Sequence, residues 1–445
     1  MADITHSSPL KKVLVITYYW PPAGGSGVQR WVKFVKYFRD FGWEPVVFTI
    51  KDGEYSLLDE SLLKDIPEGV EVLKVPAWEP HKLYMKLFGN KKGEKIHQNF
   101  LSGGKKWTWK EAVGVFIRGN FFIPDARMFW IRPSVNFITD YIKQHKIDAI
   151  VSSGPPHSCH VIALKVKEKT NIPWIADFRD PWTGIDYFDD LMLTPLSKLF
   201  HKRLEQKVLN QCNTIVAVGE SNKRDYQLLT QNTIEVIPNG YDIEIATGQS
   251  FQELDKEFTI TYLGAMNASR NPEVLWKAIQ LLIKENSAVL ENLKVKLVGS
   301  IEAKIFESIE EHGVGKYVSH TSYVPYAEAL KLQNQAQLLL IVINNTYNKS
   351  TIVPGKIYEN IASLRPIICI GPKDGDTAKI IDTTASGAVV EYDDVPFMKQ
   401  TLEKYYHQYL NKALVNEPNE NIQKYSRKAL TERMSSLLNK ITQQP

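Results

Sequence analysis

The sequence lacks the features typical of an exported, membrane-spanning or disulfide-stabilised protein. It has three cysteines in 445 residues, Cys159, Cys212 and Cys369, which are far apart and include no Cys-x-x-Cys pair. Neither a disulfide framework nor a zinc site is therefore expected. The first ten residues contain no apolar leader segment, and no stretch reaches the roughly 18 consecutive apolar residues needed to span a bilayer. These absences predict a cytoplasmic protein.

A strong net charge is also missing, although the basic residues are unevenly distributed. The formal charge is +4, but between residues 81 and 132 Lys and Arg greatly outnumber the acids Glu94, Glu111 and Asp125. Tryptophans and phenylalanines are mixed with these cations, a composition that suits the inner face of an anionic cell membrane. The alternative is an insertion with its own small core and a solvated rim. No nucleic-acid reader motif accompanies the basic excess, so nucleic acid is not expected as a partner.

The hydrophobic pattern predicts an α/β protein with parallel sheets. A β-branched run at 13–17 precedes a glycine-rich turn, apolar residues at helical spacing over 28–38, and another apolar run at 45–48. This is one βαβ unit. Further strands are expected at 70–75, 147–152, 173–177 and 214–218, and the pattern then restarts with strands at 258–263, 295–298, 338–343 and 366–370. Two Rossmann-like halves are therefore predicted.

The predicted boundary between the halves lies in the segment 236–242, where proline and Asn-Gly interrupt the pattern. We expect an N-terminal domain at 1–234, including the basic aromatic insertion at about 81–132, and a C-terminal domain at 235–405. The remaining residues, 406–445, are expected to form helices that pack back on the N-terminal domain.

The loop at 18–27 is the first candidate for a binding site. It contains Gly24 and Gly25 and lies between the first strand and its helix. Ligands of open α/β sheets bind at the carboxyl ends of strands, where glycines allow the backbone to approach a phosphate or a sugar closely. The spacing is not Gly-x-Gly-x-x-Gly, which disfavours a dinucleotide enzyme. A purely structural turn is an equal alternative.

Four stretches in order resemble the family-four retaining glycosyltransferases. They are the Pro-Pro and Gly-Gly loop after the first strand, Pro-Pro-His at 155–157 with Asp-Phe-Arg-Asp-Pro-Trp at 177–182, Pro-Asn-Gly-x-Asp at 238–242 and Pro-Gly-Lys at 354–356. The second of these is similar to one bacterial branch of the family. The resemblance, which runs from about residue 13 to about residue 370, implies a GT-B fold, with two Rossmann-like domains facing a central cleft. It also implies sugar transfer from a nucleoside diphosphate sugar to a glycan or lipid-linked acceptor with retained anomeric configuration, without a metal or other cofactor.

The resemblance assigns the donor to the C-terminal domain. Gly355 and Lys356 open a predicted helix, where backbone amides and an ammonium group would hold a diphosphate. Glu359, nearly one turn later, would accept hydrogen bonds from the ribose hydroxyls. The family pairs this glutamate with another, whose position here is occupied by Thr351, so the transferred sugar stays unassigned. Thr351 itself, together with Gly24 and Gly25, completes the expected donor-binding set.

Arg270 and His157 join Lys356 as expected catalytic residues. Arg270 follows the first strand of the C-terminal half, where its guanidinium could bind the diphosphate in a bidentate manner. The family usually adds a lysine one turn later, which this chain lacks. His157 follows a strand and a Gly-Pro-Pro turn, and the corresponding histidine in the family contacts the donor sugar near the reacting carbon.

Asp177, Arg179 and Asp180 end another strand of the N-terminal half. They are candidates either for ordering the acceptor or for an internal ion pair, and the sequence does not separate these. A GT-B sugar-nucleotide epimerase and a non-catalytic nucleotide-sugar-binding protein are the alternative functions.

Overall fold

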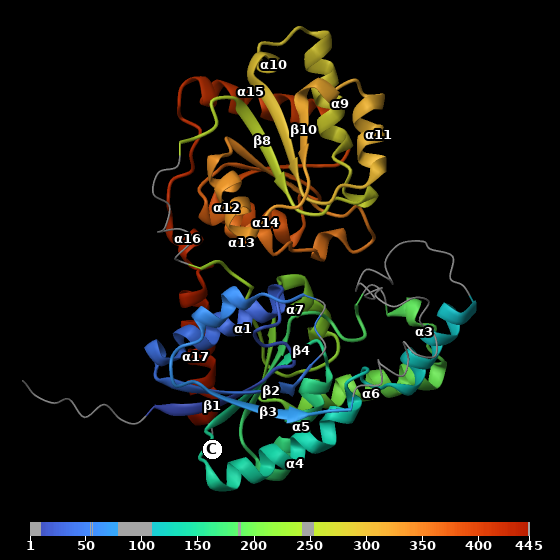
Figure 1. Ribbon diagram of the computed structural model, residues 1–445, viewed down its shortest axis with the longest axis vertical. Helices are drawn as coiled ribbons and strands as arrows, with labels where there is room; N and C mark the ends of the chain where they lie inside the picture. Colours follow the sequence, from blue (N-terminus) through green and yellow to red (C-terminus); the bar gives the residue numbers. More distant parts are fainter. Residues whose placement is uncertain are drawn as a thin grey trace, which may run out of the picture. The chain divides into compact units, whose positions relative to one another are not determined.

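The computed structural model describes residues 10–53, 55, 57–78, 109–185, 188–242 and 253–443. The chain divides into two compact units, each of which is described by itself (Figure 1). Unit 1 comprises Met1–Pro238 together with Lys428–Pro445, and unit 2 comprises Asn239–Arg427.

Unit 1 is built on a parallel sheet of seven strands in the order β3-β2-β1-β4-β5-β6-β7. The strands are β1 (Lys11–Ile16), β2 (Trp43–Lys51), β3 (Glu71–Pro76), β4 (Ala149–Gly154), β5 (Trp174–Phe178), β6 (Thr214–Ala217) and β7 (Ile234–Val236). This order is that of a Rossmann-like sheet, whose direction of winding reverses between β1 and β4. The predicted α/β class is confirmed.

Helices cover both faces of this sheet. Successive side chains of its central strands point to opposite faces, and apolar side chains on both faces must be covered. On β1, Val13 and Val15 belong to one core and Leu14 and Ile16 to the other. The α-helices of unit 1 are α1 (Ser26–Tyr37), α3 (Trp109–Phe121), α4 (Met128–Gln144), α5 (Ser158–Thr170), α6 (Pro195–Gln211), α7 (Glu220–Gln227) and α17 (Arg427–Gln443). Short 3-10 helices span Phe38–Phe41, Glu60–Asp65 and Asp189–Leu191.

Unit 2 contains a parallel sheet of six strands in the order β10-β9-β8-β11-β12-β13. The strands are β8 (Phe258–Leu263), β9 (Leu293–Val298), β10 (Val318–Thr321), β11 (Leu338–Val342), β12 (Ile367–Ile370) and β13 (Gly387–Val390). Its α-helices are α9 (Glu273–Lys284), α10 (Val289–Asn292), α11 (Ala303–Glu311), α12 (Tyr326–Gln335), α13 (Lys356–Ala362), α14 (Asp376–Thr384), α15 (Val395–Leu410) and α16 (Glu420–Gln423). Short 3-10 helices span Ala268–Arg270, Gly315–Tyr317 and Lys349–Thr351.

The second boundary between the units differs from the predicted one at 405. The chain passes into unit 2 after Pro238, inside the segment 236–242, but it returns to unit 1 only after Arg427. Helix α15, which crosses the expected boundary at 405, packs through Leu402, Tyr405 and Tyr406 into the core of unit 2. The return to unit 1 is made by α17, whose apolar side chains at helical spacing join the core beside β1 and α1: Leu430, Met434, Leu438 and Ile441.

Three short strands were not predicted, namely β7, β10 and β13, which all lie at sheet edges. Edge strands bury less side-chain surface than central strands, and in β10 both His320 and Thr321 are exposed. Such segments do not form the continuous apolar runs by which the central strands are recognised. Among the described residues, no helix is both long enough and apolar enough to cross a membrane.

Candidate functional site

The candidate residues lie at the position in each sheet where ligands of Rossmann-like folds bind. In such sheets the binding crevice opens at the carboxyl ends of the two strands between which the winding reverses. These strands are β1 and β4 in unit 1 and β8 and β11 in unit 2. His157 follows β4 and Arg270 follows β8, so each unit has a candidate group at its reversal point.

In unit 2, the ammonium group of Lys356 is held against the end of β8. Lys356 Nζ donates a hydrogen bond to the carbonyl oxygen of Leu263. The next residue is Gly264, at φ 129°, and a Cβ atom there would collide with Lys356 Nζ. Only glycine can adopt this backbone conformation without strain and also leave room for the ammonium group. Helix α13 begins at Lys356, with Gly355 as its N-cap residue.

Arg270 joins the two loops that follow β8 and β11. Its Nε donates to Asn344 Oδ1, and its Nη1 donates to the carbonyl oxygen of Ala265 at 3.1 Å. Leu263 and Ala265 flank Gly264, so the two cations are anchored two residues apart on the same turn. Burial and the charge of Arg270, opposed by Glu359, lower the pKa of Lys356 to about 8. The turn thus holds two positive groups whose mutual repulsion an anion would relieve.

Glu359 is the carboxylate of this group. Its Oε1 accepts a hydrogen bond of 2.9 Å from the hydroxyl of Tyr326, and its backbone carbonyl oxygen accepts one of 2.9 Å from Gln333 Nε2. Burial and the Glu359 carboxylate raise the pKa of Tyr326, which keeps the phenol protonated as the donor. Thr351 donates through Oγ1 to the carbonyl oxygen of Asn348 at 2.9 Å. Unit 2 thus brings together Arg270, Lys356 and Glu359, with Thr351 in the preceding 3-10 helix.

In unit 1, His157 is buried, yet its side chain contributes no hydrogen bond to the start of the helix that it precedes. It is the N-cap residue of α5 without a side-chain capping bond. Asp125 does the capping instead, since its carboxylate accepts from Ser158 N at 2.8 Å and from Ser158 Oγ at 2.6 Å. His157 Nδ1 has no hydrogen-bond partner among the described residues. The fold therefore holds this ring by packing and not by a hydrogen bond, although an unsatisfied buried nitrogen costs about 1–3 kcal/mol.

The imidazole of His157 stacks on the indole of Trp182, with ring centroids 4.7 Å apart and planes 3° from parallel. Only 8% of His157 is exposed. Burial, together with the nearby His160 and Arg179, holds the pKa of His157 well below its ordinary value. The ring is therefore neutral at physiological pH, with one nitrogen that donates and one that accepts hydrogen bonds.

Asp177 forms the internal ion pair that the sequence left open as an alternative. Its carboxylate is fully buried and pairs with Arg30 Nη2 at 2.7 Å. It also accepts from Trp31 Nε1 at 2.9 Å and from Ser153 Oγ at 3.0 Å. Arg30 in turn donates to the carbonyl oxygens of Ile237 and Pro238, at the end of unit 1. Because Asp177 has no exposed surface, it stabilises unit 1 and cannot contact a substrate directly.

Arg179 and Asp180 lie closer to the surface. Arg179 is half-buried and donates through Nη2 to the carbonyl oxygen of Pro155, so its guanidinium lies beside the turn that carries His157. A Cβ atom at Gly27, on the first turn of α1, would collide with Arg179 Nη1. Asp180 is exposed. Of the three acceptor-side candidates, Arg179 is therefore brought to the His157 group.

Gly24 and Gly25 form a loop that is fixed by a second loop of unit 1. Gly24 N donates to the carbonyl oxygen of Leu57 at 2.9 Å, and a Cβ atom at Gly24 would lie 3.0 Å from Asp59 Cβ. Gly25 has φ 109° and forms the N-cap of α1. The close contact between the two loops explains why a glycine is present at 24, and the positive φ explains the glycine at 25. No bound ligand is needed to explain them.

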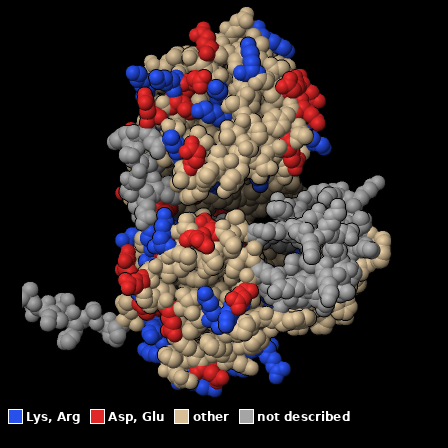
Figure 2. Space-filling view, viewed as in Figure 1, with Lys and Arg blue, Asp and Glu red and all other residues tan. Residues whose placement is uncertain are grey.

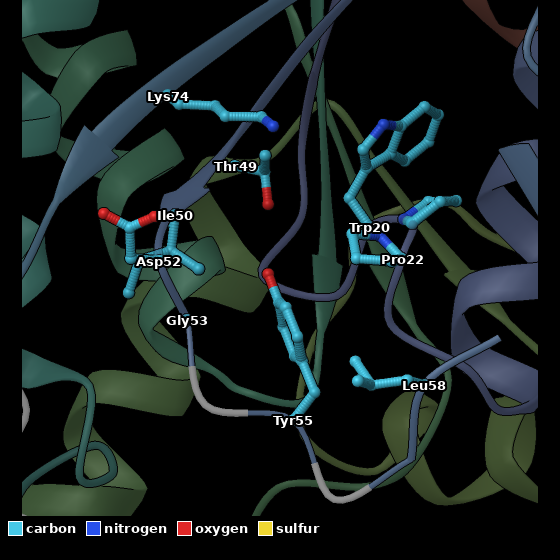
Figure 3. Close-up of a pocket in the computed structure, with 10 residues that line it drawn as sticks. Trp20, Pro22, Thr49, Ile50, Asp52, Gly53, Tyr55, Leu58 and Lys74 are labelled. Atoms are coloured by element: carbon cyan, nitrogen blue, oxygen red, sulfur yellow. The ribbon is translucent and has the colours of Figure 1, made fainter. Parts of the chain in front are cut away.

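A pocket of about 310 Å³ opens beside this loop (Figure 3). It lies at the carboxyl ends of β1 and β2, and Figure 3 shows the Tyr55 hydroxyl and the Lys74 amine reaching towards its interior. The volume is at the lower end of the range for small-molecule sites, about 300–1,000 Å³. Its lining consists of Trp20, Pro21, Pro22, Thr49, Ile50, Asp52, Gly53, Tyr55, Leu58 and Lys74.

Most of the basic aromatic segment at 81–132 lies outside the described residues. The part that is described begins with α3, whose Trp109, Val113 and Phe116 are spaced at i, i+4 and i+7 and are exposed. Figure 2 shows positive and negative side chains mixed over the visible described surface of each unit. The local basic excess is therefore not part of a wider positive field on that face.

The sequence interpretation missed the residues that support these groups. Arg30 and Trp31 hold Asp177, Trp182 supports the ring of His157, and Tyr326 orients Glu359. Each contact joins residues that are at least 25 positions apart in the sequence. The Trp182 contact had a signal, because Trp182 ends the quoted stretch 177–182.

Comparisons with known proteins show the same type of fold and a resemblance to one family over part of the chain. Residues 92–245 match the model of Glycosyltransferase Family 4. The Anabaena protein HepE, solved in complex with UDP-glucose, is similar over 96% of this chain and 99% of its own, with a TM-score of 0.57 and 12% identity. Sucrose-phosphate synthase of Thermosynechococcus elongatus is similar over 97% of this chain and 98% of its own, with a TM-score of 0.57 and 12% identity.

A third similar structure is a variant of TarM from S. aureus, solved with UDP, α-GlcNAc-glycerol and fondaparinux. The similarity covers 97% of this chain and 100% of that one, with a TM-score of 0.53 and 14% identity. A comparison with curated protein sequences finds no match. The predicted resemblance to family-four glycosyltransferases and the predicted GT-B type of fold are therefore confirmed.

Proposed function

We propose that this protein is a glycosyltransferase that binds a nucleoside diphosphate sugar through unit 2. The observation that carries the proposal is the pair of cations on the turn after β8. Lys356 and Arg270 are anchored on either side of Gly264, and among the described residues neither forms an ion pair with a carboxylate. Two positive groups without a direct ion pair, at the reversal point of a Rossmann-like sheet, favour a multiply charged anion such as a diphosphate.

This arrangement suits the chemistry of sugar transfer. Breaking the anomeric C–O bond leaves negative charge on the departing diphosphate, and fixed cations stabilise that charge in the transition state. Lys356 and Arg270 would supply this stabilisation without a metal ion. Glu359, oriented by Tyr326, would accept hydrogen bonds from the ribose hydroxyls. HepE with UDP-glucose and TarM with UDP support a uridine diphosphate sugar among the candidate donors.

His157 would contact the donor sugar, and we propose that the transfer retains the anomeric configuration. A neutral imidazole, held by packing rather than by a hydrogen bond from the described residues, can donate to or accept from a sugar hydroxyl. A double-displacement reaction would need a free carboxylate as nucleophile. Asp125 caps α5 and Asp177 is buried in an ion pair, so neither of these two carboxylates is free. Their engagement supports same-face transfer, in which the leaving phosphate helps to deprotonate the acceptor.

Unit 1 would bind the acceptor, a glycan or a lipid-linked sugar, at the inner face of the cell membrane in the cytoplasm. The pocket beside Trp20 and Tyr55 combines aromatic rings with polar groups, as sugar-binding sites do. Exposed apolar side chains on α3 and on α6 support contact with a membrane. On α6 these are Leu196, Leu199 and Phe200, next to the exposed cations Lys202 and Arg203.

The proposed function is tested by incubating the protein with a panel of uridine and guanosine diphosphate sugars and a membrane extract, and analysing the products by mass spectrometry. A glycosyltransferase increases the mass of an acceptor by one sugar and releases the nucleoside diphosphate. An altered or hydrolysed sugar without a glycosylated acceptor would identify an epimerase-type enzyme instead. Donor binding without any product, under conditions where a known transferase is active, would identify a binding protein.

A further inference from the structure

The orientation of His157 depends on the aromatic surface against which it packs. The imidazole lies parallel to the indole of Trp182, at a centroid distance of 4.7 Å. Its Nδ1 forms no hydrogen bond within the described residues, and the capping hydrogen bond at the start of α5 is made by the carboxylate of Asp125. Because no hydrogen bond from these residues fixes the imidazole, its orientation depends on the ring on which it stacks. A tilt or shift of Trp182 would therefore tilt or shift His157.

Trp182 is itself fixed by hydrogen bonds to the buried face of α6. Its Nε1 donates to His201 Nδ1 at 3.1 Å. The following residue, Thr183, donates to the carboxylate of Glu205 through its backbone N at 3.3 Å and through Oγ1 at 2.5 Å. His201 and Glu205 are four residues apart, so they lie one above the other on the same face of α6. Two successive residues, Trp182 and Thr183, are thus clamped to one helix.

The polar character of this clamp is costly. His201 is 4% exposed and Glu205 is 3% exposed. Burial raises the pKa of Glu205, against the hydrogen bonds from Thr183, and it lowers the pKa of His201. Apolar side chains packed at these two positions would stabilise the core at least as well. The polar pair fixes the orientation of the indole, because hydrogen bonds depend on angle more strongly than apolar packing does.

We propose that Trp182, His201 and Glu205 are positioning residues that hold the imidazole of His157 in the orientation required for contact with the donor sugar. The proposal rests on the role of His157 under the proposed function. The three positioning residues are almost fully buried, and in this proposal they act only through His157. Displacing a contacting group by about 1 Å can reduce turnover on the order of 100-fold, so small errors in this support would be visible in the rate.

The test compares Glu205→Leu with Glu205→Gln, because both remove the charge and only Gln keeps an acceptor for Thr183. We expect Glu205→Leu and Trp182→Phe to lower kcat about 10-fold with little change in the KM for the donor, and Glu205→Gln to remain near wild type. Trp130→Phe is the control, since it also removes an indole hydrogen bond, to the carbonyl oxygen of Val75 at 3.3 Å, away from the clamp.

The same substitutions in a His157→Ala background separate positioning from general damage. Positioning predicts that Glu205→Leu and Trp182→Phe have no further effect on kcat once the imidazole is absent. An equal loss in both backgrounds, or no loss in the wild-type background, would overturn the proposal. If His157→Ala turns over like the wild type, its assigned role is refuted together with the clamp, while glycosyl transfer stands.

A spectroscopic readout tests the clamp even if no donor is turned over. In protein labelled with ¹⁵N at histidine, the imidazole signals of His157 are assigned by their loss in His157→Asn. Positioning predicts one sharp set of signals in the wild type and in Glu205→Gln, and broadened or doubled signals in Glu205→Leu. Identical sharp signals in all three proteins would contradict the inference.

Discussion

The two candidate groups differ in how their polar side chains are satisfied. In unit 1, Asp177 and its partner Arg30 are buried and fully engaged, and His157 lies between packed aromatic rings. In unit 2, Lys356 and Arg270 donate to carbonyl and amide oxygens of turns, and neither forms an ion pair with a carboxylate among the described residues. Unit 1 therefore presents a group that is arranged before any ligand binds, whereas unit 2 presents positive charge that a ligand would neutralise.

This difference predicts that substitutions in unit 1 mainly affect stability and substitutions in unit 2 mainly affect binding. The largest effect is expected for Asp177→Asn. It leaves the Arg30 guanidinium buried without a counter-ion, and we expect a loss of roughly 3–5 kcal/mol in the free energy of unfolding. Urea denaturation of both proteins measures this loss. The control is Asp140→Asn, which breaks an exposed pair with Lys143 and should leave the midpoint unchanged.

Gly264→Ala should affect both stability and binding. The new Cβ would collide with Lys356 Nζ and the alanine would have to adopt φ 129°, so we expect a cost of roughly 1–3 kcal/mol in stability and donor binding weakened at least ~10-fold. Gly313→Ala provides the control. Gly313 also has a positive φ, 64°, but nothing lies within 4 Å of the position that a Cβ atom would take there, so stability should fall without any change in donor affinity.

The pH dependence of donor binding should report on Lys356. Its pKa of about 8 in the free protein means that the ammonium is charged below pH 8 and neutral above it. A bound diphosphate favours the charged form, so affinity should be constant below pH 8 and should fall by up to ~10-fold per pH unit above it. Calorimetry between about pH 6.5 and 9 measures this decline, since that range brackets the pKa. In Lys356→Arg the charge persists, and a decline of the same size there would refute the assignment.

The smallest effect is expected for Tyr326→Phe. It removes the hydroxyl that donates to Glu359, and we expect donor binding to weaken by about 0.5–1.5 kcal/mol. The difference in affinity between ribonucleotides and 2′-deoxyribonucleotides should shrink with it, because Glu359 loses its fixed orientation. Tyr323→Phe, at an exposed tyrosine just before α12, should change neither quantity.

The sequence predicted the central strands and the positions of the candidate residues better than their contacts. Buried runs such as 13–17 and 338–343 were recognisable because both faces of a central parallel strand are apolar. The helix around Tyr405 and Tyr406 was also predicted, but the predicted domain boundary at 405 cut through it, so the packing of Tyr406 in unit 2 was not predicted. Arg30 and Asp177 are 147 residues apart, and nothing in the local pattern of either one indicates the other.

The same limit applies to the space around the cations of unit 2. The Pro-Gly-Lys stretch indicated Lys356, but the need for glycine at 264 follows only from the position of Lys356 Nζ against the end of β8. The role of Asn344 in holding Arg270 likewise depends on β8 and β11 being neighbours in the sheet. The order of the strands in the sequence does not show that β8 and β11 are neighbours in the sheet.

The central claim is that unit 2 binds a nucleoside diphosphate sugar through its paired cations. Isothermal titration calorimetry of the wild type, Lys356→Met and the surface control Lys277→Met against uridine and guanosine diphosphate sugars tests it most directly. We predict that at least one donor binds the wild type and Lys277→Met equally, and Lys356→Met at least ~10-fold more weakly, about 1.4 kcal/mol. Binding of no donor, or equal binding by all three proteins, would contradict it.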